Sequence, residues 1–513
     1  MRVAGYPTTD PPRSGGGGPA ERESRMPPVA TALAAVLAAI VAAMAVPRVV
    51  GGSFAHLVAF GAVCAVVGLA VLRSPVVASI LLLAATFLRV ALPPIFPVDL
   101  FLVAFAGMVA SFAIWMQTHP DRLRGIGALE WAMALYLLWN LFSMVAPHEY
   151  PAIAPLTGAT YSVPRFILTG TLIPFAMYVV GRYTFERRSA VRALFWTILS
   201  FGAYSALVSV LQFRGPTSLV WPRYIVEAPN WPNRAVGVFN QPVVNGFVLA
   251  LGFTVAMLLM GSRSEPRWRR LIALIVAVGC GYGIYLTHTR AAWLGGAVVL
   301  VIGIVFAKGF RTGFVVSAGL ALSMVTINWS LFSSTDRAAG GVGSAEEVED
   351  RFNAAQTALW AFGQKPLAGW GIGRFQAVNT YHHQQWAPEV PWVRGYGIVA
   401  HQNELGILGE LGLIGLALWI AVLLLVLYRL FDAYRTLPAK GLCGKRLALV
   451  AIMALVLLIT TGFTVDLRFF DFPGAVVFLV VGVAVGWADR HKRAHVTVPG
   501  VVRPVPASSE GET

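Results

Sequence analysis

Apolar runs long enough to cross a lipid bilayer recur along almost the whole chain. A membrane-spanning helix needs about twenty mostly apolar residues, and about fourteen segments approach this length. The sequence is 57% hydrophobic and only 12% charged, whereas soluble domains carry about 25% charged residues. We therefore predict an all-α polytopic membrane protein with about fourteen transmembrane helices. They are placed near 29–47, 52–72, 75–92, 97–116, 129–146, 164–181, 191–212, 242–261, 271–287, 292–307, 313–333, 403–428, 447–465 and 473–488.

Basic residues cluster in alternate loops between these runs. Cytoplasmic loops of membrane proteins carry such an excess of Lys and Arg, so we predict that these loops and both chain ends are cytoplasmic. The net charge of +15 then reflects loop placement, and we expect no nucleic-acid partner. The loops contain Arg122/Arg124, Arg182/Arg187/Arg188, Arg263/Arg267/Arg269/Arg270, Lys308/Arg311, Arg429/Arg435/Lys440/Lys445/Arg446 and Arg490/Lys492/Arg493.

This pattern divides the chain into five parts. Residues 1–27 are rich in Gly, Pro and Arg and are predicted to be a disordered cytoplasmic tail. Residues 28–333 form the first part of the helix bundle, 334–402 a long extracytoplasmic loop with short helices, and 403–488 the last part of the bundle. Residues 489–513 form a second disordered cytoplasmic tail. No cleavable signal is apparent, because the first apolar run begins late and others follow it. The three cysteines, Cys64, Cys280 and Cys443, have no metal-like spacing and indicate no disulfide framework.

The loop 334–402 is too long to lack a function. Ser344-Ala345-Glu346-Glu347 resembles a capping box, and apolar residues follow at helical spacing. We expect an amphipathic helix over 345–362 that lies on the outer mouth of the bundle, with its acids on a solvated face. The apolar positions are Val348, Phe352, Ala355, Leu359 and Phe362, and the acids are Glu346, Glu347, Glu349 and Asp350.

The segment that follows this loop combines polar and apolar features. His401 stands where a polar region ends and an apolar run begins, and glycines recur every third residue at 406, 409, 412 and 415. On a helix this spacing leaves a strip poor in side chains, which lets a neighbouring helix approach closely. Glu410 lies within the run, where an unpaired carboxylate costs about 2.5 to 3.5 kcal/mol. We interpret this stretch as part of the functional site, at the boundary where a membrane-spanning helix begins.

Three arginines are expected on the outer face, against the general charge bias. Arg234, Arg290 and Arg351 converge there with His401. A single such arginine is as well explained by snorkelling to lipid headgroups. Three together favour an anion site, since guanidinium groups bind phosphate oxygens bidentately.

His401 is the candidate proton acceptor, because imidazole titrates near neutral pH. The alternative is a polar residue at a helix start that bonds only to its neighbours. The doublet His382 and His383 is more typical of a solvated loop. Aromatic residues at 370, 381, 386 and 392 suit either a membrane-interface belt, which we favour, or a sugar-binding surface. Asp466, Arg468 and Asp471 form an outer turn that could help to position a ligand.

Together these residues resemble the O-antigen ligase/polymerase family of membrane glycosyltransferases, over roughly residues 230–430. Gln402 departs from the family, which usually has Asn directly after the His. The resemblance rests on Arg234 with Gly237-Val238-Phe239-Asn240 and Asn245, on His288-Thr289-Arg290-Ala291-Ala292-Trp293, on Arg351, on Gly369-Trp370-Gly371-Ile372-Gly373-Arg374-Phe375, and on His401 with Glu410-Leu411-Gly412-Leu413-Ile414-Gly415-Leu416.

The resemblance implies an enzyme of the bacterial cytoplasmic membrane without cofactor or metal. It would transfer or polymerise a glycan, with inversion, from a polyprenyl-pyrophosphate carrier to an acceptor hydroxyl on the outer face. Expected partners are the bilayer, a glycan, lipid or protein acceptor, and chain-length regulators or other polysaccharide assembly proteins. The implied roles are His401 as catalytic base, Arg234 and Arg290 as pyrophosphate ligands, Arg351, Asn240, Asn245, Trp370, Arg374 and Asn403 as sugar or acceptor contacts, and Glu410, Gly412 and Gly415 as structural support.

Other functions remain open at this point. The main alternative is a flippase or other transporter for lipid-linked oligosaccharides, since about fourteen helices suit one. It would need polar residues along a path through the bilayer, whereas most charges here lie at the outer mouth. A cell-wall glycan polymerase and a non-catalytic scaffold are further possibilities. Within the favoured family, the sequence does not separate polymerase from ligase from protein O-glycosyltransferase.

Overall fold

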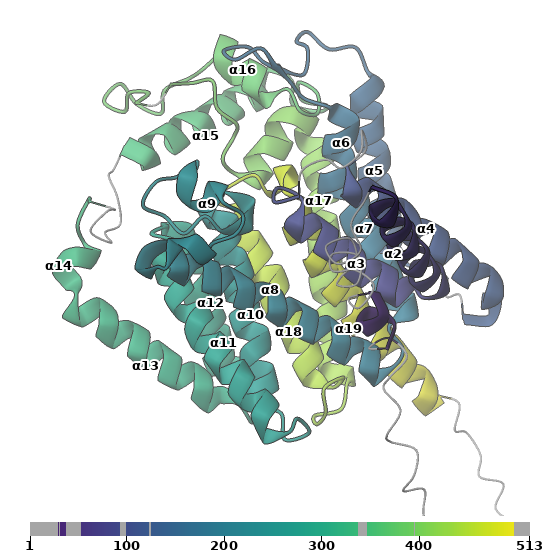
Figure 1. Cartoon of the computed structure of the whole chain (residues 1–513). Coiled ribbons are helices and arrows are strands. Elements are labelled where there is room, and N and C mark those ends of the chain that lie inside the picture. The colour runs from purple at the N-terminus through teal and green to yellow at the C-terminus, as the bar shows by residue number, and fades with distance from the viewer. Residues whose placement is uncertain are drawn as a thin grey trace, which may run out of the picture.

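The computed structural model is a bundle of long helices capped at one end by shorter helices and loops (Figure 1). It describes residues 29, 31–36, 53–92, 99–122, 125–336, 346–393 and 395–496. The strands within these ranges are β1 (Ile153–Ala154) and β2 (Ala159–Thr160), an antiparallel pair in which Ile153 lies opposite Thr160. The predicted all-α class is therefore confirmed.

The described helices have the following bounds in chain order. The α-helices are α2 (Ser53–Arg73), α3 (Pro75–Leu88), α4 (Leu100–Thr118), α5 (Ala128–Val145), α6 (Val163–Ile167), α7 (Ile173–Thr184), α8 (Arg188–Arg214), α9 (Tyr224–Glu227), α10 (Pro242–Met260), α11 (Arg267–Leu286), α12 (Arg290–Phe306), α13 (Arg311–Ile327), α14 (Trp329–Phe332), α15 (Glu346–Gln364), α16 (Phe375–Tyr381), α17 (Asn403–Thr436), α18 (Lys445–Gly462) and α19 (Asp471–Val496). Short 3-10 helices are η1 (Pro120–Arg122), η3 (Thr217–Leu219), η4 (Gly237–Phe239) and η5 (Leu467–Phe469), and η2 (Leu168–Leu172) is a π-helix.

Nine helical segments among the described residues are long and apolar enough to cross a membrane, and one of them is the run Val163–Thr184 that joins α6, η2 and α7. Shorter apolar helices over 62–73, 75–88, 290–306 and 311–327 coincide with four further predicted spans. Most of the predicted helix 29–47 lies outside the described residues. The structure thus supports a polytopic membrane protein, while the predicted count of about fourteen spans is not confirmed.

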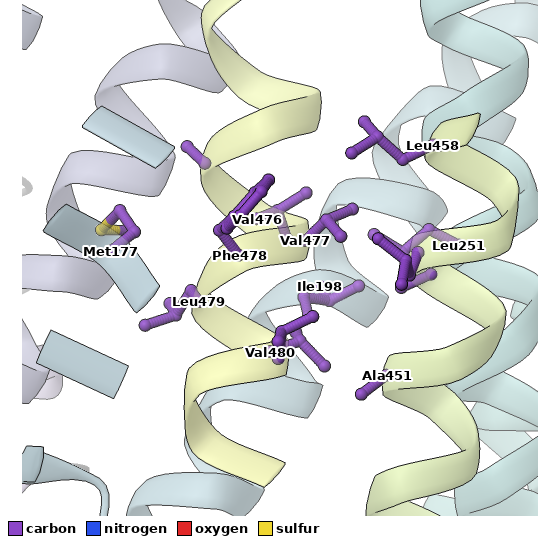
Figure 2. Close-up of a cluster of buried hydrophobic side chains, with 14 of the residues drawn as sticks. Met177, Ile198, Leu251, Ala451, Leu458, Val476, Val477, Phe478, Leu479 and Val480 are labelled. Carbon is purple, nitrogen blue, oxygen red and sulfur yellow. The ribbon is translucent and has the colours of Figure 1, made fainter. Parts of the chain in front are cut away.

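The core of the bundle is formed by α10, α18 and α19. In the most apolar part of each helix, 94% of the residues of α10 and 89% of those of α19 are buried, whereas only 17% of those of α4 are. A helix that is apolar all round is expected at the centre of a bundle, and α10 has this composition. Figure 2 shows how α19 fills the centre, with Val477 and Val480 near Leu251 of α10 and Ala451 of α18.

Small residues allow the closest helix contact, between α7 and α19. A Cβ atom on Gly482 would lie 2.1 Å from the Tyr178 carbonyl oxygen, and one on Gly486 would lie 2.2 Å from that of Arg182. Glycines at such an interface let two helix backbones touch, which favours association inside a membrane. The sequence predicts this kind of packing along α17 as well, but there the structure uses a glycine to break the helix.

The two ends of the bundle differ in charge. The basic connections α10–α11, α12–α13 and α17–α18 lie at the end opposite α9, α15 and α16 (Figure 1). At this basic end Arg182 forms ion pairs with Glu130 and Asp489, and Arg192 pairs with Glu265 at 2.9 Å. The described basic loops therefore share one end, in agreement with the alternation along the sequence.

Helix α15 covers the other end of the bundle, close to its predicted position. Its fully buried alanines, Ala354, Ala358 and Ala361, form one face. Beside them lies a buried polar stripe that holds the segment 384–393. Asp350 Oδ1 accepts from Val393 N at 2.8 Å, Asn353 Oδ1 accepts from Trp386 N at 2.8 Å, and Thr357 Oγ1 accepts from Gln384 N at 3.0 Å.

This arrangement overturns the predicted orientation of the helix. Asp350 is fully buried and not part of a solvated acidic face, because its carboxylate binds a backbone N–H of the neighbouring segment. The large apolar residues Phe352 and Leu359 are exposed, while alanines pack inward. The capping residues Ser344 and Ala345 lie outside the described residues.

Candidate functional site

A pocket at the capped end of the bundle brings together four of the predicted site residues. It encloses about 600 Å³ of space, including its open mouth. Its lining residues are Trp231, Arg234, Gln241, Val243, Thr289, Arg290, Ala291, Val348, Arg351, His401, Thr464 and Val465. We call this the arginine pocket. No carboxylate side chain is among these lining residues, so its charged lining is cationic.

Arg234 reaches the pocket from the connection between α8 and α10. Its carbonyl oxygen accepts from Gln212 Nε2 at 2.9 Å, and the next residue, Ala235, donates its N–H to Leu286 O at 2.9 Å. The guanidinium lies over the Trp231 ring, 4.8 Å from its centroid, and the residue is 9% exposed. These contacts hold Arg234 at the pocket wall.

Arg290 is the first residue of α12 and enters from the tight turn after α11. His288 adopts a positive φ of 43° in this turn, and its Nδ1 lies 2.7 Å from Asn233 O. The turn and the Arg234 segment are therefore joined directly. This explains why two arginines far apart in sequence line one pocket.

Arg351 and Val348 line the pocket from α15, three residues apart and hence on one side of the helix. His401 is half-buried and directly precedes Gln402, the N-cap residue of α17. Its φ of 52° lies in a region that is uncommon for residues other than glycine and merits a functional explanation. The preceding Ala400 is buried against α15 and α16.

Two predicted ligand contacts support the Arg234 segment instead. Asn245 is fully buried, and its amide donates to Ala235 O at 3.0 Å and to Ser209 Oγ at 3.1 Å. Asn240 has a positive φ of 49°, and its Oδ1 accepts from Asn230 N at 2.9 Å. Neither lines the arginine pocket, so both positions suit support of the loop better than the expected contact with sugar.

Three more predicted contacts lie apart from the pocket. Trp370 is buried between Tyr150 and Trp360, with its Nε1 donating to Ala361 O at 2.9 Å. Arg374 donates to the carbonyl oxygens of Tyr150 and Ile372. Burial lowers the pKa of Arg374, and the nearby Glu410 carboxylate opposes this shift. Asn403 faces a second, mostly apolar pocket with Glu404 and Trp419.

The histidine doublet is also better packed than its sequence indicated. His382 Nε2 lies 2.6 Å from the Tyr150 hydroxyl, and its ring stacks on Trp360 at 4.8 Å. His383 is exposed and stacks on Tyr396 at 3.8 Å. Both histidines thus pack within the shorter helices and loops of residues 346–402 that cap the bundle, which we call the capping layer. Neither histidine lines the arginine pocket.

Helix α17 is broken at Gly412, which has φ 66° and ψ −165°. Residues 366–371 enter this break and satisfy the backbone groups that it opens. Trp370 N donates to Gly409 O at 3.0 Å, Gly371 N to Glu410 O at 2.8 Å, and Leu413 N to Pro366 O at 2.8 Å. At Gly412 the glycine strip therefore admits a loop and not the predicted neighbouring helix. An irregular backbone at membrane depth is tolerated where protein covers it.

Glu410 is paired, as its position within an apolar run requires. Its Oε2 accepts from Arg468 at 2.9 Å, its Oε1 accepts from Phe375 N at 3.2 Å, and Arg468 also binds Asp466 at 2.6 Å. All three charged side chains are buried. Asp466 and Arg468, which we had considered as ligand contacts, thus connect α17 to the turn whose Thr464 and Val465 line the arginine pocket.

Replacing Gly412 by alanine is expected to lower stability by about 1 to 3 kcal/mol, because its backbone conformation is almost exclusive to glycine. An added Cβ would also lie 2.3 Å from Leu367 O. Thermal unfolding of the purified protein in detergent measures the effect. Gly363→Ala in α15 is the matched control, because a Cβ there meets nothing within 4 Å and a helical Gly→Ala change gains about 0.5 to 1 kcal/mol. Equal melting temperatures of Gly412→Ala and the parent protein would contradict the broken helix.

Several lining residues were missed by sequence reasoning. Thr464 and Val465 carry no signal, since they join the pocket only through the fold. Gln241 did carry one, because its side chain accepts from Val243 N at 3.0 Å and caps α10 ahead of Pro242. A polar cap before a proline marks a helix start, and this helix starts at the pocket.

The fold and the pocket define a polytopic helical membrane protein with a cationic site at one end of its bundle. Residues 274–420 match the model of the O-antigen ligase family, so this part of the chain is similar to that family. The match includes Arg290, Arg351 and His401, while Arg234 lies before it. No curated protein matches the chain significantly. The predicted resemblance is confirmed over the matched segment, and it supports an O-antigen ligase type of function in broad terms.

Proposed function

We propose that the protein is a membrane glycosyltransferase that uses a polyprenyl-pyrophosphate-linked glycan as donor. The observation that carries this proposal is the arginine pocket, in which Arg234, Arg290, Arg351 and His401 lie together. Guanidinium groups are suited to bind the two phosphates of such a donor. Their position at one end of the bundle would place a pyrophosphate near a bilayer surface while the polyprenyl chain remains in lipid.

The proposed reaction is a single displacement without a metal. His401 takes the proton of the acceptor hydroxyl as that oxygen attacks the anomeric carbon. The bond from this carbon to the pyrophosphate oxygen breaks on the opposite face, so the anomeric configuration inverts. Arg234 and Arg290 stabilise the negative charge that develops on the departing polyprenyl pyrophosphate. Arg351, which lines the same pocket from α15, contacts the sugar next to the bond that breaks.

The positive-inside pattern supports a cytoplasmic membrane orientation in which the basic end faces the cytoplasm. The arginine pocket then opens on the outer surface. The acceptor would be a glycan, lipid or protein hydroxyl, and the remaining part of the capping layer, residues 346–402, is available to recognise it. Chain-length regulators or other assembly proteins are possible partners at the same surface.

Removing either donor-binding cation should reduce turnover strongly. Arg234→Gln and Arg290→Gln are each expected to lower kcat by about 10²- to 10³-fold, the usual loss when one group that stabilises developing charge is removed. Transfer of labelled glycan by the purified protein in lipid nanodiscs measures the effect. Arg214→Gln is the matched control, because this exposed arginine at the end of α8 contacts Tyr282 and not the pocket. Normal turnover in both pocket variants would contradict a pyrophosphate site.

The glycans of a deletion strain test the function as a whole. Carrier-linked glycan that accumulates on the outer face is expected for a transferase, whereas accumulation on the inner face would favour the flippase. Single repeat units would identify a polymerase, and long chains that remain on the carrier would identify a ligase. Intact envelope glycans of normal length would contradict the polymerase, the ligase and the flippase activity alike.

A further inference from the structure

Helix α15 exposes a continuous apolar stripe on the capped end of the bundle. Val348, Phe352, Ala355 and Leu359 recur at helical spacing on one side. Phe352 is 47% exposed and Leu359 is 44% exposed, although large apolar residues normally face a core. At its N-terminal end the stripe meets the arginine pocket, because Val348 lines that pocket.

This exposure is imposed by the way α15 packs. Its alanine face lies inward, and its polar stripe of Asp350, Asn353 and Thr357 is fully buried beneath the segment 384–393. With both of these faces occupied inside the protein, Phe352 and Leu359 are left on the outer side of the helix. The stripe is therefore a fixed feature of the folded protein and not a product of fraying.

The stripe continues into the flank of a membrane-spanning helix. Leu367 follows α15 and is 62% exposed, and its carbonyl oxygen accepts from Ile414 N at 3.3 Å. From this point the exposed residues Leu413, Ile414, Ile420 and Leu424 follow along α17. Exposed aliphatic residues of a spanning helix face lipid, because lipid chains are as apolar as leucine. Exposed apolar residues thus recur from the mouth of the pocket along α15 and Leu367 to the lipid-facing flank of α17.

Trp386 extends this surface at the pocket end. Its ring lies 5.6 Å from that of Phe352 and is exposed, and its backbone is held by Asn353. Tryptophan is enriched at membrane–water interfaces, where its apolar ring and its N–H find suitable surroundings at the same depth.

We propose that this surface, the apolar track of Val348, Phe352, Leu359, Leu367 and Trp386, lies in the headgroup region of the bilayer. Helix α15 is then an interfacial helix whose apolar side enters the leaflet on the pocket side. Continuity with the flank of α17 favours the bilayer over a glycan as occupant. The aliphatic members Val348, Leu359 and Leu367 offer no ring on which a sugar could stack.

The track has a consequence that rests on the proposed function. A lipid-linked donor that diffuses within the leaflet meets the track before its headgroup enters the arginine pocket. The helix that carries Arg351 would therefore also form the lipid-facing entrance to the site.

Fluorescent labels on single cysteines in lipid nanodiscs test the position of α15 without any need for activity. The exposed Cys64 is replaced by Ser, while Cys280 and Cys443 are buried and can remain because the label does not reach them. In this background, labels are placed at Phe352→Cys and Leu359→Cys. Gln364→Cys is the matched control, because Gln364 is an exposed residue of the same helix. It lies five residues after Leu359, so the two side chains are about 140° apart around the helix axis. Leu424→Cys on α17 reports full contact with lipid.

Nitroxide-bearing lipids are expected to quench the labels at 352 and 359 at least about twofold more than the label at 364, as apolar burial in the headgroup region requires. Aqueous iodide should show the reverse order. Quenching by iodide alone at 352 and 359 would overturn the proposal. Protection from iodide by soluble envelope oligosaccharide would identify a glycan surface instead, and protection from both quenchers would identify a protein partner or a second copy.

A second measurement separates this inference from the proposed reaction. Leu359→Asp should lower transfer from a full-length polyprenyl donor about tenfold and leave transfer from a short-chain, water-soluble donor unchanged, because only the former reaches the site through the leaflet. Equal loss with both donors would overturn the entrance role. If no donor is turned over by the parent protein, the proposed function fails, while the quenching result stands by itself.

Discussion

The variant His401→Ala is expected to abolish glycan transfer, with a loss of about 10²- to 10⁴-fold, the range for removal of a general base. The reason is that the imidazole lines the arginine pocket together with the cations that are proposed to hold the leaving group. Protein abundance should not change, since His401 lies in a half-buried turn and not in the core, and the supply of lipid-linked donor should stay intact. Transfer in nanodiscs and the glycan profile of a complemented deletion strain give the measurement.

His383→Ala is the control for this experiment. His383 belongs to the same capping layer but stacks on Tyr396 away from the pocket, so its loss should leave most transfer intact. Normal glycan assembly in the His401→Ala strain would remove the histidine from the mechanism. A fall in protein abundance that parallels the loss of transfer would indicate a structural role for His401 instead.

The second large effect is expected at Arg468. Arg468→Met should destabilise the protein by about 3 to 5 kcal/mol, because it leaves the carboxylates of Glu410 and Asp466 buried without their cation. Both ion pairs are short, 2.9 Å to Glu410 and 2.6 Å to Asp466. Thermal unfolding in detergent, followed by the yield of monodisperse protein, measures the loss.

Two comparisons make this prediction specific. Arg223→Met removes an exposed ion pair with Glu227 and should cost less than about 1 kcal/mol. The triple variant Arg468→Met, Glu410→Gln, Asp466→Asn should recover much of the stability, since it removes the uncompensated charges as well. If the single variant melts at the parent temperature, the buried network contributes nothing and the argument fails.

The candidate site was predicted in part from the sequence. Arg234, Arg290, Arg351 and His401 carried a readable signal, because cations and a histidine on the predicted outer face run against the charge bias of the rest of the chain. The structure brings all four to one pocket. No sequence pattern indicated what would surround Asn245, Trp370 and Arg374. In the structure each of these side chains donates a hydrogen bond to a backbone carbonyl oxygen of the scaffold.

The orientation of α15 shows why sequence reasoning failed elsewhere. Apolar periodicity locates a helix, but the face that is buried depends on what is packed against it. Here alanines face the bundle, Asp350 and Asn353 face a backbone segment, and Phe352 is left outside. The pattern predicts which residues share a face, and the neighbours decide where that face points.

The sequence alone determined that this is a helical membrane protein, because hydropathy acts residue by residue and requires no partner. It also predicted that cations and an imidazole collect at one end of the bundle. Only the tertiary structure decided that Gly412 breaks a helix to admit residues 366–371, that Arg468 binds Glu410, and that α15 turns its apolar side outward. These features depend on contacts between segments far apart in the chain, whose hydrogen bonds and charges find their partners only when the fold is complete.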